Sequence, residues 1–408
     1  MSYLVLGLAR SGQAAALALR RRGEEVIGVD ASPDIETGRL AEAGVELHLG
    51  TEEESLLDRA ETLIKSPGVP GETPLVEAAR ARGIPVWSEL ELGARLLGNP
   101  IVGVTGTNGK TTTSELLGVM LGAPVAGNVG RALCDLDGRI EPGEVVVCEV
   151  SSFQLEDIHE FRPHVAVLLN LEPDHLDRHG SIDAYRAAKL RIFENQGEGD
   201  VAVVPVGFDD IPGRARRIEF EPSDELPAEP RIPGAHNREN AAAATAAAQA
   251  LGIDDVRIAE TLETFPGVAH RLEHVAEAGG VRFVNDSKAT NTAAARRAVA
   301  AYDGPLHMIL GGRGKGESYA ELALDMAGRV RRAYLIGETA KEIGTALELA
   351  GVDHELSGDL ETAIRSAAKN AQPGEIVLLA PACASYDQFH DFEERGEVFR
   401  RIVAEVAS

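Results

Sequence analysis

Residues 103–112 read GVTGTNGKTT, a glycine-rich stretch that could hold phosphates. It follows an apolar run and precedes the helix-like TTTSELLGVML, which is the strand–loop–helix context of a P-loop. In such a loop backbone N–H groups cradle phosphates, a lysine reaches the β- and γ-phosphates, and the next hydroxyl holds Mg²⁺. Lys110 and Thr111 have these positions. The standard pattern G-x-x-x-x-G-K-[ST] nevertheless fails, because its first glycine would fall at Val104 and the glycine present is Gly103.

Two later stretches carry candidate metal ligands. Glu149 ends the apolar run of VVVCEVSSFQ, and a strand-end carboxylate beside a P-loop predicts a magnesium ligand. In NLEPDHLDRHGS, His175 and His179 alternate with Asp174 and Asp177. A zinc site would need a third soft ligand, which is not evident, and magnesium beside phosphates suits the acid-rich loop better. The third alternative is a solvated loop that binds no metal. The residue types leave this choice open.

Lysine usage singles out further positions. Only seven of the 40 basic residues are lysines, so arginine serves as the ordinary surface cation of this chain. A lysine kept within a polar, glycine-rich stretch therefore predicts a role that arginine cannot fill. Lys110, Lys189, Lys288 and Lys315 meet this description. Tyr185 lies one helical turn before Lys189, which predicts that the two share a helix face.

A second glycine turn lies near the start of the chain. GLARSG at residues 7–12 nearly matches the dinucleotide pattern G-x-G-x-x-G, but Ala9 replaces the middle glycine. Asp30 follows at about the position of a ribose-binding acid. The middle glycine of this pattern lets the backbone approach a pyrophosphate, and the methyl group of Ala9 hinders that approach. A tight strand-to-helix turn that binds no ligand is therefore an equal alternative to a nucleotide site.

The elements that must position these residues alternate between strands and helices. This alternation over 408 residues predicts an α/β fold with mostly parallel sheets and three domains. These are an N-terminal Rossmann-like domain (1–96), a central P-loop ATPase domain (97–267) and a C-terminal Rossmann-like domain (268–408). Predicted strands are 3–6, 26–29, 101–104, 145–148, 165–169, 281–284, 306–310, 333–336 and 376–379. Helices are expected at 13–22, near 184–193 and in NAAAATAAAQAL, with loops and short edge strands over 208–232.

Three polar motifs follow predicted strands of the third domain. They are NDSKATN, GGRGKG and PACASYDQF. Ligands of open parallel sheets bind beyond the carboxyl ends of the strands. With Lys288, Arg313 and Lys315 in these loops, the sequence predicts a pocket for an anion or a carboxylate.

Composition excludes several classes of partner. The net charge of −25 argues against nucleic acid or an anionic membrane surface. Cys134, Cys148 and Cys383 fit no zinc spacing and argue against a disulfide framework. No apolar run is long enough for a membrane span, and no basic leader precedes the apolar start. The sequence therefore predicts a reduced, cytoplasmic protein.

The motifs in their order resemble the Mur ligases, whose ATP loop reads TGTNGK[ST]T. The displaced glycine is thus this family's form of the loop. The resemblance covers essentially the whole chain and rests on GVTGTNGKTTT, GNVG, EVSSFQLE, DHLDRHGS, YRAAKLRIFEN, GAHNREN, HRLE, NDSKATN, GGRGKG and PACASYDQF. SSFQLE, NDSKATN and PACAS-x-DQF are most similar to the members that add D-glutamate, and separate the chain from sister ligases and folylpolyglutamate synthetases.

The resemblance implies an amide ligase of cytoplasmic peptidoglycan precursor synthesis. ATP would phosphorylate the carboxylate of UDP-N-acetylmuramoyl-L-alanine, and the amine of D-glutamate would attack the acyl phosphate. Two Mg²⁺ ions would stabilise the transferring phosphoryl group, and the site would exclude water. The first domain would bind the uridine nucleotide, the second ATP and the third the amino acid, within a monomer. A sister ligase that adds another amino acid, such as L-glutamate, is the alternative.

The resemblance also implies roles for individual residues. The catalytic residues would be Lys110, Glu149, His175 and Lys189. The metal ligands would be Thr111, Glu149, His175 and Lys189, the last as a carbamate, which turns a cation into a carboxylate. ATP would contact Gly106, Thr107, Asn108, Gly109, Lys110, Thr111, Thr112, Asn240, Arg271 and Asp286. The UDP substrate would contact Ala9, Arg10, Ser11, Asn128 and Gln154. The amino acid would contact Lys288, Thr290, Lys315, Ser385 and Phe392.

The chain departs from the family pattern in places. Ala9 replaces a glycine that is common in the family, and Arg313 stands where some members have aspartate. The stretch DASPD lacks the arginine that some members use to hold the nucleotide, and the region 208–232 is shorter than in the family pattern.

Other classes fit less well. A regulatory GTPase would need an [NT]-K-x-D motif, and no lysine lies in one. A nicotinamide enzyme leaves Lys110 and Glu149 unexplained, and a non-catalytic scaffold should have a broken catalytic set.

Overall fold

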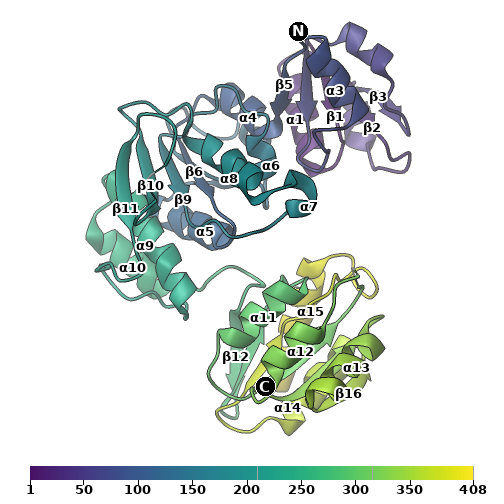
Figure 1. Cartoon of the computed structure of the whole chain (residues 1–408), viewed down its shortest axis with the longest axis vertical. Helices are drawn as coiled ribbons and strands as arrows, with labels where there is room; N and C mark the ends of the chain where they lie inside the picture. Colours follow the sequence, from purple (N-terminus) through teal and green to yellow (C-terminus); the bar gives the residue numbers. More distant parts are fainter. Residues whose placement is uncertain (209, 315, 408) are drawn as a thin grey trace. The chain divides into compact units, whose positions relative to one another are not determined.

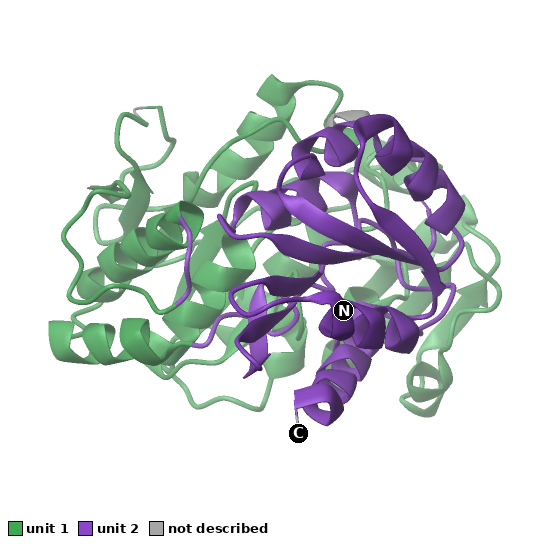
Figure 2. Ribbon diagram, turned by 90° about the horizontal axis from the view of Figure 1, so that it is seen from below, with its two compact units in different colours: residues 1–231, 235–265 green, residues 232–234, 266–408 purple. Residues whose placement is uncertain are grey.

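A computed structural model describes residues 1–208, 210–314 and 316–407 of the chain (Figure 1). The chain forms two compact units, which Figure 2 colours separately. Unit 1 consists of residues 1–231 and 235–265, and unit 2 of residues 232–234 and 266–408. Both are built from mostly parallel sheets and helices, which confirms the predicted fold class. The predicted bound at residue 96 lies inside unit 1, so the three domain ranges stay a prediction.

The first sheet of unit 1 lies within residues 2–88, all of them described. Its five strands are parallel, in the order β3-β2-β1-β4-β5. They are β1 (Ser2–Leu6), β2 (Glu25–Asp30), β3 (Glu46–Leu49), β4 (Thr62–Lys65) and β5 (Val86–Ser88). The connecting helices are α1 (Arg10–Arg21), α2 (Gly38–Glu42), the 3₁₀ helix η1 (Glu54–Arg59) and α3 (Pro74–Ala81). The strand order reverses between β1 and β4, so the GLARSG turn after β1 lies at a topological switch point, where such sheets bind ligands.

The second sheet of unit 1 is also parallel throughout its described strands, in the order β11-β10-β9-β6-β8-β7. They are β6 (Ile101–Thr105), β7 (Val125–Gly127), β8 (Val146–Glu149), β9 (Val165–Leu168), β10 (Val201–Pro205) and β11 (Arg216–Phe220). Because β6 pairs with β8 and β9, the loop after β6 is flanked by the loops that follow these two strands. β11 lies at the sheet edge, as expected for the 208–232 region.

Helices of varied length accompany this sheet. They are α4 (Glu89–Leu97), α5 (Lys110–Leu121), η2 (Leu133–Leu136), α6 (Ser152–Leu155), α7 (Leu176–His179), α8 (Ile182–Leu190), η3 (Arg191–Phe193), α9 (Ala235–Ala250) and α10 (Asp255–Thr264). α9 is the predicted alanine-rich helix, and α8 with η3 covers the predicted helix near 184–193. α4 follows β5 directly and therefore joins the two sheets of unit 1.

Unit 2 has one sheet, whose described strands run in the order β12-β13-β17-β14-β15-β16. They are β12 (Glu273–Ala278), β13 (Val281–Asn285), β14 (Leu306–Gly311), β15 (Val330–Ile336), β16 (His354–Gly358) and β17 (Ile376–Leu379). Only β12 is antiparallel to its described neighbour. The helices are α11 (Thr292–Ala300), α12 (Ala320–Met326), α13 (Ala340–Ala350), α14 (Leu360–Asn370) and α15 (Phe392–Ala407).

Two cores lie on opposite faces of the unit 2 sheet. In β17, Ile376 and Leu378 belong to one core, and Val377 and Leu379 to the other. Successive side chains of a strand point to opposite faces, so a strand covered on both faces needs apolar residues at every position. This explains why such strands are continuous apolar runs in the sequence. None of the described helices is long and apolar enough to cross a membrane.

Candidate active site

The P-loop connects β6 to α5, as the sequence predicts. Gly106 and Gly109 have φ angles of 156° and 83°, backbone conformations that favour glycine. A Cβ atom on Gly109 would lie 2.1 Å from Oδ1 of Asn240, so a side chain at this position would force the Asn240 side chain to move. Helix α5 begins at Lys110, and the N–H groups of a helix N-terminus favour an anion. The loop therefore has the form of a phosphate cradle.

Asn170 and Glu172, in the loop that follows β9, hold the P-loop in place. The backbone N–H of Asn108 donates to Oδ1 of Asn170 at 2.8 Å, and its Nδ2 donates to Oε2 of Glu172 at 2.7 Å. Thr107 N donates to Asn170 O at 3.0 Å, and Glu172 N donates to Thr107 Oγ1 at 3.0 Å. Neither residue is among the site residues predicted from the sequence. The only feature of the sequence that could have identified them is their position in NLEPDH, directly after the strand that pairs with β6.

Two lysine ammonium groups meet at one carbonyl of this loop. Nζ of Lys110 donates to Gly106 O and Thr107 O, both at 2.9 Å, and Nζ of Lys189 donates to Gly106 O at 2.8 Å. The Lys189 residue is 2% exposed. Burial, together with the charge of Lys110, lowers the pKa of Lys189 to about 7. The two amino groups therefore lie side by side at the P-loop, where the charge of Lys110 disfavours a charge on Lys189.

Tyr185 and Lys189 share one face of α8, as predicted. Nζ of Lys189 lies 4.8 Å from the centre of the Tyr185 ring. The Tyr185 hydroxyl lies 3.0 Å from Oγ1 of Thr107, so this helix face contacts the P-loop at two points. The pKa of Tyr185 is raised to about 12, mainly by burial, so the phenol stays protonated and can donate to Thr107.

Glu149 ends β8 beside the P-loop. It pairs in register with Val104 of β6 and is 2% exposed. Nδ2 of Asn128 donates to Oε1 of Glu149 at 3.0 Å, and Nη2 of Arg10 donates to the carbonyl oxygen of Asn128 at 3.1 Å. A predicted metal ligand and two residues predicted to bind the UDP substrate are thus in contact. Thr111 lies in the first turn of α5 and is buried.

Gln154 has a structural task at the start of α6. Its Oε1 accepts hydrogen bonds from N and Oγ of Ser151 at 3.0 and 3.1 Å, which completes a capping box at the start of α6. The residue is fully buried, and its Nε2 has no hydrogen-bond partner among the described residues. Its predicted contact with the UDP substrate stays a prediction.

The two histidines of DHLDRHGS lie in different surroundings. The His175 side chain is about half exposed, its φ is 50°, and Nε2 lies 3.5 Å from Oδ2 of Asp174. The His179 ring is stacked on Phe153, with centroids 5.2 Å apart, and its Nε2 lies 3.0 Å from Oγ of Ser152. His179 thus packs against α6, whereas His175 is accessible. Among the described residues, no three His, Cys, Asp or Glu side chains cluster as metal ligands.

The carboxylate of Asp30 accepts backbone N–H groups and thereby stabilises the GLARSG turn. Its Oδ2 accepts from Leu8 N at 2.6 Å and its Oδ1 from Ser32 N at 2.8 Å. Ala9 is the N-cap residue of α1 and has no side-chain acceptor, so the start of the helix can receive a phosphate. Ala9 and Arg10 are exposed, which fits their predicted contact with the UDP substrate.

Arg271 and Asp286 lie close together in unit 2. Oδ1 of Asp286 accepts from Leu272 N at 3.2 Å. Burial raises the pKa of Asp286 to about 6, although the charge of Arg271 opposes the shift. Arg271 stands between His270 and Leu272, whose φ angles are 62° and 42°. Positive φ angles at two non-glycine residues, one on each side of Arg271, indicate a strained backbone of the kind found at functional sites.

The described residues predicted to bind the amino acid lie beyond the carboxyl ends of β13 and β17. Lys288 and Thr290 follow β13, Ser385 follows β17 and is buried, and Nζ of Lys288 lies 5.9 Å from the Phe392 ring centre. Lys315 lies outside the described residues.

Arg313 exchanges backbone hydrogen bonds of 2.9 and 3.1 Å with Ala384 in this region. Its side chain pairs with Glu338 at 3.1 Å, so a carboxylate balances this departure from the family pattern.

Comparison with known proteins gives matches over most of the chain. Family profiles match a MurD-like Mur ligase N-terminal domain (1–88), a Mur ligase middle domain (104–212) and a Mur ligase glutamate ligase domain (270–383). A protein of Pelotomaculum thermopropionicum named UDP-N-acetylmuramoylalanine–D-glutamate ligase is 43% identical, with 98% of this chain and 96% of the relative covered. The protein of that name from Anaeromyxobacter dehalogenans is 42% identical, with 99% and 97% covered.

Solved structures share the fold at low sequence identity. UDP-N-acetylmuramate–alanine ligase MurC of Thermotoga maritima has a TM-score of 0.60 at 20% identity, with 99% of each chain covered. MurF of the same organism, solved in complex with ADP, has a TM-score of 0.59 at 18% identity, with 94% of this chain and 96% of that one covered.

Proposed function

The chain belongs to the Mur ligase family, and we propose that it joins D-glutamate to UDP-N-acetylmuramoyl-L-alanine with ATP. The observation that carries this proposal is 43% identity, over nearly the full length of both chains, to a relative named for that reaction. The name of the relatives favours D-glutamate over the alternative, a sister ligase for another amino acid. We also propose a monomer, because the predicted site residues all come from one chain, and a cytoplasmic location, because the three cysteines are free thiols.

The residues of unit 1 fit ATP and divalent metal. The glycine cradle at 106–109, the start of α5 and the ammonium group of Lys110 suit phosphates. Thr111 and Glu149 would hold one Mg²⁺, and Glu149 and His175 would hold a second together with a carbamate on Lys189. ATP supplies the phosphoryl group that converts the substrate carboxylate to an acyl phosphate. Lys110 would stabilise the charge on the transferring oxygens.

The surroundings of Lys189 support carbamylation. Its ammonium group is buried and bonds a backbone carbonyl, and the carboxylates of Asp174 and Glu149 offset the lowering of its pKa only in part. Both this burial and the nearby charge of Lys110 favour the neutral amine, which is the form that adds CO₂. The carbamate would replace a cation beside Lys110 by an anion able to hold metal.

The proposed roles of unit 2 are contacts with the amino acid and with ATP. Lys288 and Thr290 after β13 and Ser385 after β17 would bind glutamate together with Lys315 and Phe392. The surroundings of Lys288, with the Phe392 ring nearby, suit the carboxylate and the aliphatic part of such a ligand.

Phosphate release tests the proposed function. The purified protein is incubated with Mg-ATP and UDP-N-acetylmuramoyl-L-alanine, and D-glutamate, L-glutamate, meso-diaminopimelate or L-lysine is added singly. Release with D-glutamate alone is expected. Release with another amino acid would keep the ligase chemistry but replace the substrate, and no release with any would contradict the nucleotide substrate.

A further inference from the structure

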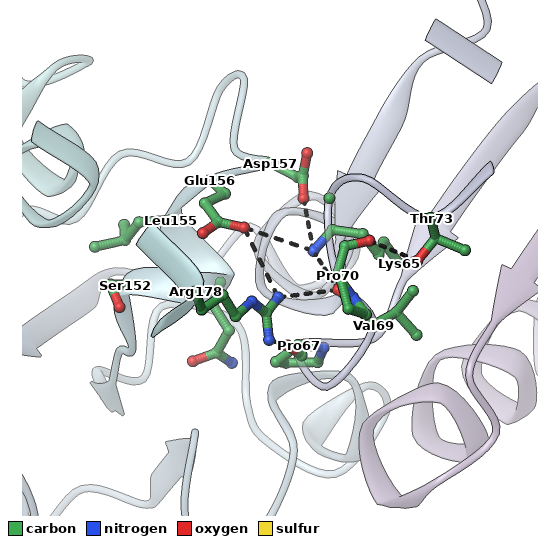
Figure 3. Close-up of polar contacts among 12 residues, drawn as sticks. Lys65, Pro67, Val69, Pro70, Thr73, Ser152, Leu155, Glu156, Asp157 and Arg178 are labelled. Atoms are coloured by element: carbon green, nitrogen blue, oxygen red, sulfur yellow. Dashed lines mark hydrogen bonds and ion pairs between the residues drawn. The ribbon is translucent and has the colours of Figure 1, made fainter. Parts of the chain in front are cut away.

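A group of charged side chains, with the buried Lys65 and Asp157 at its centre, joins the two sheets of unit 1 (Figure 3). Lys65, the last residue of β4, is 1% exposed. Its Nζ lies 3.1 Å from Oδ2 of Asp157 and 3.8 Å from Oε2 of Glu156, both directly after α6. Oδ1 of Asp157 accepts from Nη2 of Arg80 at 2.8 Å. Lysine is almost never fully buried without a partner, and removal from water costs free energy even when it is paired.

These cations hold the segment of residues 66–71, SPGVPG. Nζ of Lys65 donates to the carbonyl oxygen of Val69 at 3.1 Å. From the other side, Arg178 of α7 donates to the same oxygen at 2.9 Å and to Pro67 O at 2.8 Å (Figure 3). The Arg178 guanidinium also lies 3.9 Å from the centre of the Phe153 ring. The Val69 carbonyl oxygen thus accepts from Lys65 of the first sheet and from Arg178, whose helix follows β9 of the second sheet. This shared contact fixes the distance between the two sheets at this point.

Segment 66–71 lies between two predicted sites. On one side, Oγ of Ser66 donates to Gly7 O at 2.6 Å, and a Cβ on Gly7 would lie 2.8 Å from a methyl of Val69. Gly7 begins the turn predicted to bind the UDP substrate. On the other side, Arg178 follows the predicted metal ligand His175 by three residues. Segment 66–71 therefore connects the nucleotide turn to the loop that carries His175.

We propose that Lys65 and Arg178 are positioning residues that set the location of the nucleotide turn relative to the His175 loop. The proposal rests on the proposed function, because the carboxylate to be phosphorylated belongs to the nucleotide substrate. Reactions between bound groups are sensitive to misplacements of about 1 Å, which can cost about 100-fold in rate. Asp157 lies 3.1 Å from the Lys65 ammonium group and holds it beside the segment.

The central variant is Lys65→Met/Asp157→Leu. Lys65→Met alone would leave the buried Asp157 carboxylate without its lysine, so its effect could reflect misfolding. The double variant removes both charges, while Arg80 is half exposed and can be solvated. Arg59→Met/Glu46→Gln, which removes an exposed pair of the first sheet with contacts of 2.6 and 2.7 Å, is the matched control.

Two measurements separate positioning from stability. Amide hydrogen exchange of residues 66–71 and 174–179 is measured on the ligand-free proteins, and kcat and KM are measured for each substrate. In the double variant we expect a thermal midpoint near that of the wild type and about tenfold faster exchange in both segments. We also expect kcat about tenfold lower and KM for the UDP substrate raised more than KM for ATP. Arg59→Met/Glu46→Gln should match the wild type.

The outcomes distinguish this proposal from the proposed function. A double variant with wild-type exchange and wild-type kinetics would overturn the positioning role alone. A wild-type protein without ligase activity would overturn the proposed function, and with it the kinetic role given to Lys65 and Arg178. In that case faster exchange of both segments would still support the physical connection. As a further check, Arg178→Lys should retain more kcat than Arg178→Met, because lysine can still donate to one of the carbonyls.

Discussion

Lys110 and Lys189 meet at the carbonyl oxygen of Gly106, at distances of 2.9 and 2.8 Å. An ammonium group is compact and can lose its proton when buried, whereas a guanidinium is broad and stays charged. Arginine is therefore a poor replacement at both positions, which explains why a chain with seven lysines keeps two of them here. The two side chains differ in their expected tasks, and each can be tested by itself.

Lys110→Ala should abolish turnover while the fold persists. The side chain extends over the P-loop, where it would stabilise charge on the transferring phosphoryl group. Loss of one such group costs about 100- to 1000-fold in kcat. Phosphate release and the far-ultraviolet circular dichroism spectrum measure activity and fold. Lys341→Ala, a change on the exposed surface of α13, is the control. Normal turnover by Lys110→Ala would contradict the P-loop assignment.

Lys189→Ala should lose activity for a different reason. If the lysine carries a carbamate, the variant lacks a metal ligand that bicarbonate cannot rebuild, whereas a small added carboxylic acid can partly replace it. Lys189→Arg should be inactive and should resist this rescue, because its guanidinium fills the space. Phosphate release is measured with and without bicarbonate or acetate. Full activity of Lys189→Arg would show that only positive charge is needed there.

At the scale of elements, α4 fastens the two sheets of unit 1 through a buried carboxylate. Glu91 accepts the backbone N–H groups of His159, Glu160 and Phe161 at 2.8 to 3.1 Å, and Nε of Arg95 at 2.6 Å. Burial opposes its ionisation, but these hydrogen bonds outweigh burial and lower the pKa of Glu91. The ionised side chain thus anchors the segment 159–161 to α4.

Glu91→Gln should destabilise unit 1, by about 3 kcal/mol at neutral pH, because an amide nitrogen would face backbone donors. A lowered folded-state pKa stabilises the fold above the unfolded value, near 4.5 for glutamate, and this contribution is lost as pH falls through the folded-state pKa. The difference from the wild type should therefore shrink below about pH 4.5. Urea unfolding across pH measures it, with the exposed Glu160→Gln as control. A constant difference down to low pH would contradict this account.

The sequence predicts elements better than it predicts the contacts between them. Strands such as Ile376–Leu379 are apolar at every position because both faces are covered, and this local pattern is readable. β12 reads EHVAEA, whose polar character gives no such signal. Lys65, Asn170 and Glu172 act through partners about 60 to 90 residues away, as the pairs of Asn108 with Asn170 and of Lys65 with Asp157 show. No local pattern identifies such partners, whereas the P-loop is a single contiguous stretch.

At the scale of the whole molecule, the predicted ATP contacts are divided between units. The P-loop and Asn240 belong to unit 1, and Arg271 and Asp286 belong to unit 2. The buried Asp286 carboxyl lies near Arg271, whose neighbours both have positive φ angles. Holding a residue in this backbone conformation costs about 1 to 3 kcal/mol, and other interactions of a stable fold compensate for this cost. Such strained residues are common at functional sites.

Arg271→Ala should therefore raise KM for ATP or lower kcat, and should leave the affinity of unit 1 for the UDP substrate unchanged. The expected loss in kcat/KM for ATP is about 10- to 100-fold, the range for one charge-assisted contact. Steady-state kinetics with varied ATP measures it, and equilibrium binding of UDP-N-acetylmuramoyl-L-alanine supplies the second readout. Arg296→Ala, which removes surface ion pairs with Glu321 and Asp325 in the same unit, is the control. Wild-type kinetics of Arg271→Ala would mean that ATP turnover does not require this arginine, and an equal loss in both variants would trace the effect to the stability of unit 2.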